Sequence, residues 1–348
     1  QNTKMKKVSV IILNYNGQNH LDTYLPSVIK NTPLHLADII VADNASTDNS
    51  VEWLKETYPA IKIIQLKRNY GFAEGYNISI GRVETPYVIL LNSDVEVTSN
   101  WLDTLLNYAR AHEDVVAIQP KILSWQSKED AIKAGSSEIL FEHAGAAGGM
   151  IDILGYPYCR GRFLSHVEYD HGQYDDIVPI FWASGACLFI RRDIYQKLGG
   201  LDAQFFAHQE EIDLCWRINS QGYKIIVLPQ SVVYHLGGGA LGYESPRKTF
   251  LNFRNNLLML YKNLSPSKLP WIFLIRFFLD YVAALQMLLS GNRLNAKAVV
   301  NARCDFWRMR ISYKHKRSEC IRSAKSTPIF TISKRSIIFD YYVRGKRR

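Results

Sequence analysis

One stretch, residues 87–97 with the sequence YVILLNSDVEV, limits the possible folds more than any other. Its first five residues form an unbroken apolar run, which is typical of a central strand covered by helices on both faces. Asn92, Ser93 and Asp94 end this run. Ligands of an open α/β sheet bind beyond the carboxyl ends of its strands, so these three oxygen-bearing residues are expected at a ligand site.

The chemistry of these three residues suits a metal ion. Carboxylate and carboxamide oxygens are hard ligands for Mg²⁺ or Mn²⁺, and such ions bridge phosphate oxygens. The structural alternative is a turn that leads into a helix near Trp101, since Asn, Ser and Asp also favour turns. The tripeptide by itself leaves both interpretations open, and the rest of the chain has to decide between them.

Strands and helices alternate through the first part of the chain. Apolar runs at 8–13, 38–42, 61–66 and 87–91 are separated by helical patterns. This order predicts a mainly parallel, doubly wound α/β sheet with right-handed crossovers. The carboxyl ends of its parallel strands lie along one edge, so the polar turns that follow them are expected to meet there.

These turns suit a nucleotide. Asp43 can accept a hydrogen bond from a pyrimidine N3–H or a ribose hydroxyl, Arg68 can bind a phosphate, and Gly71 and Gly75 let the backbone approach a ligand closely. Taken singly, each residue has a structural alternative, because Asp43 can cap a turn and the glycines can serve the fold. No GxGxxG follows the first strand, so the dinucleotide-binding fingerprint is absent.

The second half contains a long loop and a further strand. Residues 126–176 look irregular, and so long a loop in a compact domain is usually functional or disordered. Residues 180–195 are predicted to form a strand, in which the small Ser184 and Gly185 let a ligand lie against the backbone. Another strand is expected at 224–228.

Acidic residues and a histidine form the second candidate site. Helical spacing brings Glu210 and Asp213 together and places Glu211 about 100 degrees round the helix. Three acids in four positions are electrostatically costly unless they are solvated, paired or functional, and solvation is the structural alternative. His235 follows a strand and precedes three glycines, which fits an imidazole beside a phosphate or a metal; a core histidine with satisfied hydrogen bonds is the alternative.

Together these segments resemble the inverting glycosyltransferase family 2, and within it the bacterial branch that builds surface polysaccharides and includes rhamnosyltransferases. The resemblance covers most of residues 8–240. The matching motifs occur in the order of the family: NYNG, DNASTD, NYGFAEGYN, LLNSD, ASGACLFIRR, GGLDAQFFAHQEEIDLCWR and VVYHLGGG. It implies the GT-A fold, a Rossmann-like nucleotide-binding domain with a mainly parallel sheet.

The resemblance also implies roles for particular residues. Asp94 and His235 would bind the metal, Mn²⁺ or Mg²⁺, and Glu211 would be the catalytic base. Asn92 stands where the family has its first aspartate, and Glu211 replaces an aspartate of the family's pair. The expected donor nucleotide-binding residues are Asn14, Asn16, Asp43, Arg68, Asn69, Gly71, Gly75, Asn92 and Ser93. The expected acceptor and sugar residues are Trp182, Gly185, Glu210 and Asp213.

The implied reaction is a single displacement that inverts the anomeric carbon. A sugar would move from a nucleoside-diphosphate sugar, dTDP-rhamnose or a UDP-hexose, to a hydroxyl of a growing, lipid-linked polysaccharide. One alternative is a sugar nucleotidyltransferase, but the first loop NYNGQNH lacks the expected glycines and basic residues. Another is a catalytically weak nucleotide-sugar-binding module at the membrane, which Asn92 favours and which Glu211 and His235 oppose.

The carboxyl-terminal part has a different composition. Residues 254–348 hold 20 Lys and Arg against 4 Asp and Glu, whereas 1–253 hold 22 against 28. A basic tail on an acidic body indicates an anionic partner, a membrane leaflet or nucleic acid. No RNP or KH pattern is present, so we expect no nucleic acid. Five scattered cysteines without a CxxC pair favour free thiols in a reducing compartment and argue against a zinc site.

Two segments of this basic part are candidates for membrane contact. Residues 269–289 are apolar and long enough to span a bilayer, but Arg276 and Asp280 interrupt them. Residues 293–310 resemble a basic amphipathic helix lying on a membrane, and the alternative is a helix packed on the catalytic domain. We therefore expect a catalytic domain at 5–245 and a helical, membrane-associating extension at 246–348. The protein would be peripheral on the cytoplasmic face of the membrane. Within the extension, residues 337–343 are expected to have some β character.

Overall fold

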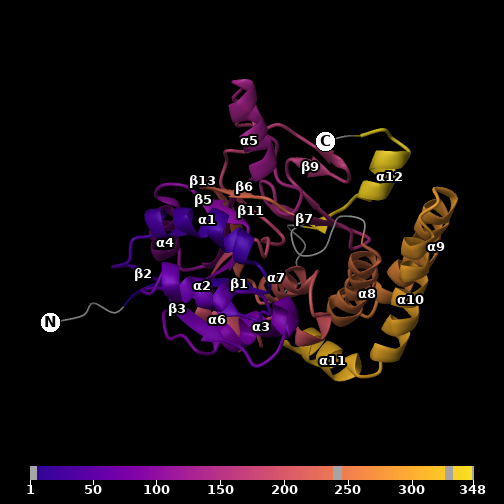
Figure 1. Cartoon of the computed structure of the whole chain (residues 1–348). Coiled ribbons are helices and arrows are strands. Elements are labelled where there is room, and N and C mark those ends of the chain that lie inside the picture. Colours follow the sequence, from indigo (N-terminus) through magenta and orange to yellow (C-terminus); the bar gives the residue numbers. More distant parts are fainter. Residues whose placement is uncertain (1–5, 238–244, 326–331, 347–348) are drawn as a thin grey trace.

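The computed structural model describes residues 6–237, 245–325 and 332–346 (Figure 1). Most of the predicted strands lie in one large sheet. Its strands are β1 Val8–Asn14, β2 Ala37–Asp43, β3 Lys62–Gln65, β4 Tyr87–Asn92, β5 Val95–Val97, β6 Val115–Ser124, β11 Val178–Pro179, β12 Cys187–Arg191 and β13 Lys224–His235. Within the described residues their order is β11-β13-β6-β12-β4-β1-β2-β3, and β5 pairs with β13.

One half of the sheet is the predicted parallel unit. β3, β2, β1 and β4 pair in parallel, with Asn14 opposite Asp43 and Leu13 opposite Asn92. This register aligns the carboxyl ends of three strands at one edge, as the sequence predicted. Beyond β4 the sheet is mixed, because β12 pairs antiparallel with both β4 and β6.

Helices cover both faces of the sheet. They are α1 Gln18–Asn31, α2 Ser50–Thr57, α3 Gly71–Ile80, α4 Trp101–Ala111, α5 Trp125–Ala134, α6 Arg192–Lys197 and α7 Glu210–Ser220, with a 3-10 turn η1 at Ala203–Phe205. Alternate strand residues enter different cores: Ile11 and Leu90 pack with α3 and α7, whereas Ile12 and Ile89 pack with α1 and α4. Burial on both faces explains why the central strands are continuous apolar runs.

Two predictions for the second half are wrong in part. Residues 126–176 are not wholly irregular, because they contain most of α5 and four short strands, β7 Gly149–Asp152, β8 Pro157–Cys159, β9 Arg162–Phe163 and β10 His166–Val167. Strands of two to four residues are too short to show an alternating pattern, and β14 Ile332–Ser333 from the far end of the chain completes their sheet. The strand predicted at 180–195 is confined to β12, and α6 follows it at once.

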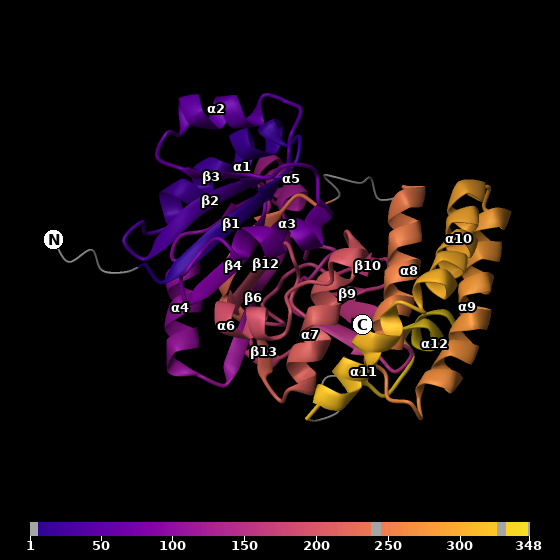
Figure 2. The ribbon, with the colours of Figure 1, turned by 90° about the horizontal axis from the view of Figure 1, so that it is seen from below.

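The carboxyl-terminal part is helical, as predicted. Its helices are α8 Pro246–Asn263, α9 Leu269–Leu289, α10 Arg293–Met309, α11 Tyr313–Ser323 and α12 Ile337–Tyr342. α8 contacts α7, α10 packs on α8, and α9 lies outermost against α10 (Figure 2). The β character expected at 337–343 is wrong: Ser336 accepts a hydrogen bond from the Phe339 amide and begins α12. Most of the glycine run after His235, and Met5 at the expected domain start, lie outside the described residues.

Candidate active site

A cavity of about 1050 Å³ lies at the carboxyl edge of the parallel strands, between the sheet, the start of α7 and the start of α8. Its lining includes both candidate sites, the turn after β4 and the acidic start of α7, which are far apart in the sequence. The predicted residues that line it are Asn16, Asn69, Gly71, Asn92, Ser93, Asp94, Trp182, Gly185, Glu210, Glu211 and His235. The predicted residues Asn14, Asp43, Arg68, Gly75 and Asp213 are not in its lining.

Asp94 and His235 meet because two strands pair directly behind them. β5 follows the turn after β4 and pairs antiparallel with the end of β13, which sets His235 opposite Val95. The Nε2 atom of His235 lies 3.2 Å from the Asp94 Oδ1 atom and 3.4 Å from the Asn92 Nδ2 atom. The residues of the family's metal motif therefore surround one imidazole nitrogen.

Glu142 is a functional candidate that the sequence analysis missed. Its Oε1 atom lies 3.5 Å from the Nδ1 atom of His235, on the opposite side of the ring from Asp94, and its side chain is buried. Burial alone would lower the pKa of His235, but the Asp94 and Glu142 carboxylates outweigh burial and raise that pKa to about 10. Glu142 lies in the 126–176 segment, which had been singled out only for its length.

A divalent ion fits the donor atoms in part. Asp94 offers a carboxylate, and His235 offers an imidazole that can bind Mn²⁺ or Mg²⁺ once it has lost the proton that its two carboxylate neighbours stabilise. Among the described residues, no group of three or more His, Cys, Asp or Glu side chains could hold a metal ion. Asp94 and His235 are therefore a partial ligand set, of the kind that such ions complete with water and substrate phosphates.

The start of α7 directs two acids into the cavity. The segment that precedes α7 has an unusual backbone. Positive φ angles occur at Phe206 (67°), His208 (70°) and Gln209 (72°). Glu210 and Glu211 each have a buried Oε2 atom without a hydrogen-bond partner among the described residues. Burial raises the pKa of both carboxyls above the usual range, and for Glu210 the neighbouring Glu211 charge adds to that rise. A raised pKa brings a carboxylate closer to the range in which it works as a general base at neutral pH.

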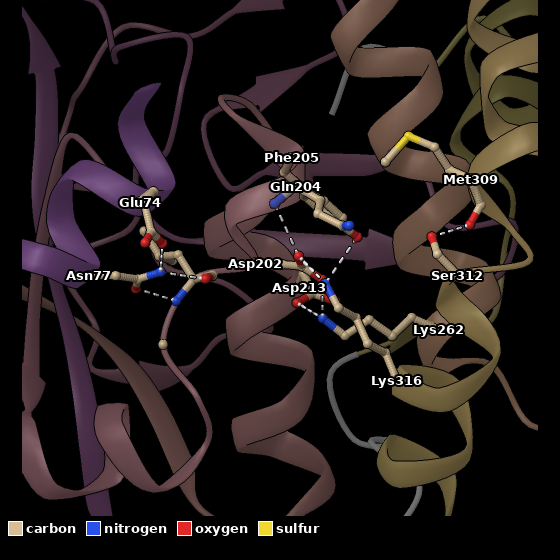
Figure 3. Close-up of polar contacts among 12 residues, drawn as sticks. Glu74, Asn77, Asp202, Gln204, Phe205, Asp213, Lys262, Met309, Ser312 and Lys316 are labelled. Carbon is tan, nitrogen blue, oxygen red and sulfur yellow. Dashed lines mark hydrogen bonds and ion pairs between the residues drawn. The ribbon is translucent and has the colours of Figure 1, made fainter. Parts of the chain in front are cut away.

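Asp213 faces the other side of α7. Figure 3 shows it in an ion-pair network with Lys262 of α8, whose Nζ atom lies 2.8 Å from the Asp213 carboxylate and 2.9 Å from Asp202. Arg217 also binds Asp213 at 2.9 Å. Burial would raise the pKa of Asp213, but Lys262 and Arg217 outweigh it and lower that pKa. Asp213 thus ties α7 to the carboxyl-terminal helices, although the sequence placed it beside Glu210 as a sugar residue.

Asn14 and Asp43 lie behind the edge of the sheet where the sequence analysis expected a nucleotide. The Nδ2 atom of Asn14 donates to the Asp43 Oδ1 atom at 3.1 Å, and the Ser46 amide donates to the Asp43 Oδ2 atom at 3.0 Å. Asn14 and Asp43 are both buried. Asn16 lines the cavity and accepts a hydrogen bond from the Thr47 amide at 2.7 Å. These bonds fix the loop after β2 to the end of β1.

In the turn before α3 and in α3 itself, some of the predicted residues line the cavity and others do not. Asn69 lines the cavity, and its Oδ1 atom accepts from the Gly71 amide at 2.8 Å. Gly71 has a φ of +77°, and a Cβ atom there would lie 2.5 Å from the Phe206 ring, so only glycine fits. Arg68 is exposed over the Tyr70 ring. Gly75 packs α3 closely on β1 and does not reach the cavity.

The segment before β12 forms another wall. Trp182 is buried and donates from its Nε1 atom to the Met150 carbonyl at 2.8 Å. A Cβ atom at Gly185 would lie 3.0 Å from Phe72 and 4.0 Å from the Glu211 Cβ atom. The bare backbone at Gly185 therefore lies next to Glu211, where a ligand can approach both.

Basic residues that the sequence analysis did not select line a further part of the cavity. They are Arg162 of β9 and Arg247 and Lys248 of α8. Arg162 falls within the long segment 126–176, and the other two fall just past the expected domain boundary at 245. No motif marked any of the three, because their convergence depends on how α8 folds back onto the sheet domain.

Comparisons with known proteins identify relatives of this chain. The chain is 24% identical over 237 residues to N-acetylglucosaminyl-diphospho-decaprenol L-rhamnosyltransferase of Mycobacterium tuberculosis, covering 65% of this chain and 75% of the relative. It is 25% identical over 240 residues to the O-antigen biosynthesis protein RfbC of Myxococcus xanthus, covering 66% of this chain but 17% of that longer protein.

Solved structures share the fold. A mannosyltransferase from Pyrobaculum calidifontis, solved with GDP-Man and Mn²⁺, aligns with a TM-score of 0.53 at 15% identity, over 92% of this chain and 87% of that one. TarS from S. aureus, solved with UDP-GlcNAc, aligns with a TM-score of 0.52 at 16% identity, over 91% of this chain and 89% of that one. The model of the family described as "Glycosyl transferase family 2" matches residues 9–199, more than half of the sequence. The chain therefore belongs to glycosyltransferase family 2.

Proposed function

We propose that this glycosyltransferase moves a sugar from a nucleoside-diphosphate sugar to a hydroxyl of a growing, lipid-linked cell-surface polysaccharide, with inversion at the anomeric carbon. One observation carries the proposal: Glu211, a half-buried glutamate with a buried Oε2 atom and a raised pKa, lines the same cavity as Asp94 and His235. A base and a partial site for a metal and diphosphate are what a single displacement requires at its two ends.

In this mechanism Glu211 accepts the proton of the acceptor hydroxyl while the hydroxyl oxygen bonds to the anomeric carbon and the bond to the diphosphate breaks. Asp94 and His235 would hold the metal, which supplies positive charge that stabilises the departing diphosphate. Gly185 beside Glu211 leaves room for the reacting sugar, and Trp182 forms the neighbouring apolar wall. The Oε2 atom of Glu211 is buried, which limits its contact with water.

The donor would lie along the edge formed by Asn16, Asn69 and Ser93, with Asp43 and Asn14 supporting that edge from behind. We propose dTDP-rhamnose or a UDP-hexose as the donor. The mycobacterial relative is named a rhamnosyltransferase with a diphospho-decaprenol-linked substrate, and RfbC is named for O-antigen biosynthesis. These names support a lipid-linked polysaccharide acceptor for this chain.

Attachment to the membrane would use the outer face of α9. This helix is long and apolar enough to cross a membrane. Its outward side chains Trp271, Phe278, Leu285 and Leu289 recur at helical spacing and are exposed, Phe278 by 62%. Its one arginine, Arg276, is 2% exposed and turned inward.

The inward face of α9 favours a helix that lies on the bilayer. Arg276 donates to Asn256 of α8 at 2.6 Å, and Asp280 pairs with Arg276 at 3.3 Å and with Arg303 of α10 at 2.5 Å. A helix that crossed the bilayer would have to break these buried contacts, at several kcal/mol for each uncompensated charge. We propose that residues 246–348 hold the catalytic domain, 5–245, on the cytoplasmic leaflet, with no nucleic-acid partner.

A screen of nucleotide sugars by thermal unfolding, with and without Mn²⁺, tests the proposed donor class. A ligand that binds only the folded protein raises its melting temperature. We expect a dTDP- or UDP-sugar to raise it, and Mn²⁺ to increase the effect. Equal melting temperatures with all nucleotide sugars at saturating concentration would contradict the proposed donor class.

A further inference from the structure

One part of the cavity lining is basic. Arg162 comes from β9, whereas Arg247 and Lys248 come from the first turn of α8, and all three line the same cavity as Glu211 and Asp94. The acids of the cavity belong to other elements, the turn after β4, the start of α7 and the segment around Glu142. Positive and negative charges are therefore contributed by separate elements of the fold.

The cations lower the pKa values of two histidines that line the same cavity, His143 and His208. Burial, and then the Arg162 guanidinium, lower the pKa of His143 to about 4, and Lys248 adds to that decrease. Burial and Lys248 also lower the pKa of His208 to about 4. Both Arg162 and Lys248 thus act on His143, so their charges converge on one region of the cavity.

Some basic residues elsewhere among the described residues have acidic partners, but the two arginines of the cavity differ. Lys121 pairs with Asp170 at 2.8 Å. Within the described part of the chain, Arg162 donates instead to the Leu164 carbonyl at 3.0 Å, and its Nε atom is buried without a hydrogen-bond partner. Arg247 lies over the Phe206 ring at 5.2 Å. Neither guanidinium forms an ion pair with a carboxylate of the described residues.

Glu142 does not neutralise this basic group by itself. It lies near Lys248, but it already faces the Nδ1 atom of His235 at 3.5 Å and accepts a hydrogen bond from the Ala144 amide. The start of α8 adds further positive character, because its first turn carries no acid and its N-cap Ser245 makes no side-chain cap. A net positive wall inside a cavity favours an anionic ligand.

We propose that Arg162, Arg247 and Lys248 form a phosphate-binding site, separate from the Asp94–His235 pair, for the phosphate groups of a substrate. The inference rests on the proposed function and adds a ligand class to it. Two sources share this chemistry: the diphosphate of the donor and a phosphate that links the acceptor sugar to its lipid. Arg162 would give directional hydrogen bonds to phosphate oxygens, and Lys248 a point charge.

Calorimetry with inorganic pyrophosphate in metal-free buffer tests the site without the Asp94–His235 metal. We expect wild-type protein to bind pyrophosphate, and Arg162→Gln and Lys248→Gln each to weaken binding by roughly tenfold, as expected for one charge-assisted contact. Lys297→Gln removes the same charge from the exposed face of α10 and should bind as wild type does. Thermal unfolding of each variant checks that the fold is intact, with Lys248→Gln as the informative variant if Arg162→Gln unfolds.

A competition experiment separates the two phosphate sources. If saturating dTDP or UDP displaces the pyrophosphate, the site takes the donor diphosphate; if pyrophosphate still binds, the site takes an acceptor phosphate. Absence of pyrophosphate binding, or wild-type affinity in folded Lys248→Gln, would overturn the site and leave sugar transfer untouched. Conversely, a chain that binds pyrophosphate through Lys248 but transfers no sugar would keep the site and remove the proposed function.

Discussion

At the scale of single residues, the cavity depends on positions where only one side chain fits. Gly71 is an example, because its φ of +77° is unfavourable for other residues and a Cβ atom there would meet the Phe206 ring at 2.5 Å. Gly135 has a similar φ of +65° but open space around it. We expect Gly71→Ala to lower the free energy of unfolding by more than Gly135→Ala, which should cost only the backbone strain of about 1 kcal/mol. Urea unfolding measures the free energy of unfolding of both variants. Equal losses would show that the Phe206 ring moves aside without a loss of stability.

The proposed site for a metal and the donor diphosphate can be tested at Asp94. Asp94→Asn keeps the size of the side chain and removes the charge that lies 3.2 Å from the His235 Nε2 atom. We expect it to weaken binding of dTDP or UDP in the presence of Mn²⁺ by at least roughly tenfold, a loss that even an outer partner of a metal ligand causes. Asp103→Asn on α4, outside the cavity lining, is the control. Unchanged affinity of Asp94→Asn by calorimetry would remove Asp94 from the metal site.

At the scale of elements, the sequence predicted what repeats locally and missed what depends on distant partners. The runs at 8–13 and 87–91 identify β1 and β4, because strands buried on both faces are continuously apolar. Glu210 and Asp213 lie on one side of an ideal helix, yet Asp213 forms an ion pair with Lys262 of α8 and does not line the cavity. Glu142 belongs to no motif, and it lies beside His235 because its amide donates to the Ile122 carbonyl of β6, the strand next to β13. Residues whose partners lie far along the chain could therefore not be assigned from the sequence.

The network in Figure 3 ties α7 to α8 and α11, and its stability can be measured. Lys262 is buried between Asp202 and Asp213, so Lys262→Gln leaves two buried carboxylates with one cation fewer. We expect a loss of about 3 kcal/mol in the free energy of unfolding. Lys316→Gln should cost less, because Lys316 is partly exposed and, among the described carboxylates, pairs with Asp202 but not with Asp213; its other hydrogen bond goes to the neutral Gln204. A loss in Lys262→Gln no larger than that in Lys316→Gln would contradict the structural role of this network.

The same network sets a dependence of stability on pH. Burial would raise the pKa of Asp202, but Lys262 and Lys316 outweigh it and lower that pKa from its usual 3.8 to about 2. A carboxyl with a lowered pKa in the folded state stabilises the fold above its unfolded pKa, and this contribution is lost as pH falls through the folded pKa. We therefore expect the stability difference between wild type and Lys262→Gln to shrink between about pH 4 and pH 2. A difference that stays constant over that range would contradict the lowered pKa.

At the scale of the whole molecule, one chain carries both the cavity and the apolar outer face of α9, the face proposed to bind the membrane and bring the cavity to a membrane-bound acceptor. We expect the double variant Phe278→Glu and Leu285→Glu to reduce binding to anionic liposomes by tenfold or more, since each buried apolar side chain contributes about 1.5–3 kcal/mol. Leu34→Glu, an exposed site far from α9 in the sequence, is the control. High salt should also weaken wild-type binding. If wild-type protein does not float with liposomes, the outer face of α9 does not bind a membrane.

We propose that the cavity performs inverting sugar transfer with Glu211 as its base. The direct measurement is the initial rate of sugar transfer by Glu211→Gln at saturating donor, beside its donor affinity and the same values for Glu210→Gln. Glu211→Gln keeps the size of the side chain and removes the base, so we expect kcat to fall by roughly 10²-fold or more with donor affinity nearly unchanged. Glu210→Gln should act mainly on binding or stability. Wild-type turnover in Glu211→Gln, or a loss confined to donor affinity, would show that Glu211 is not the catalytic base.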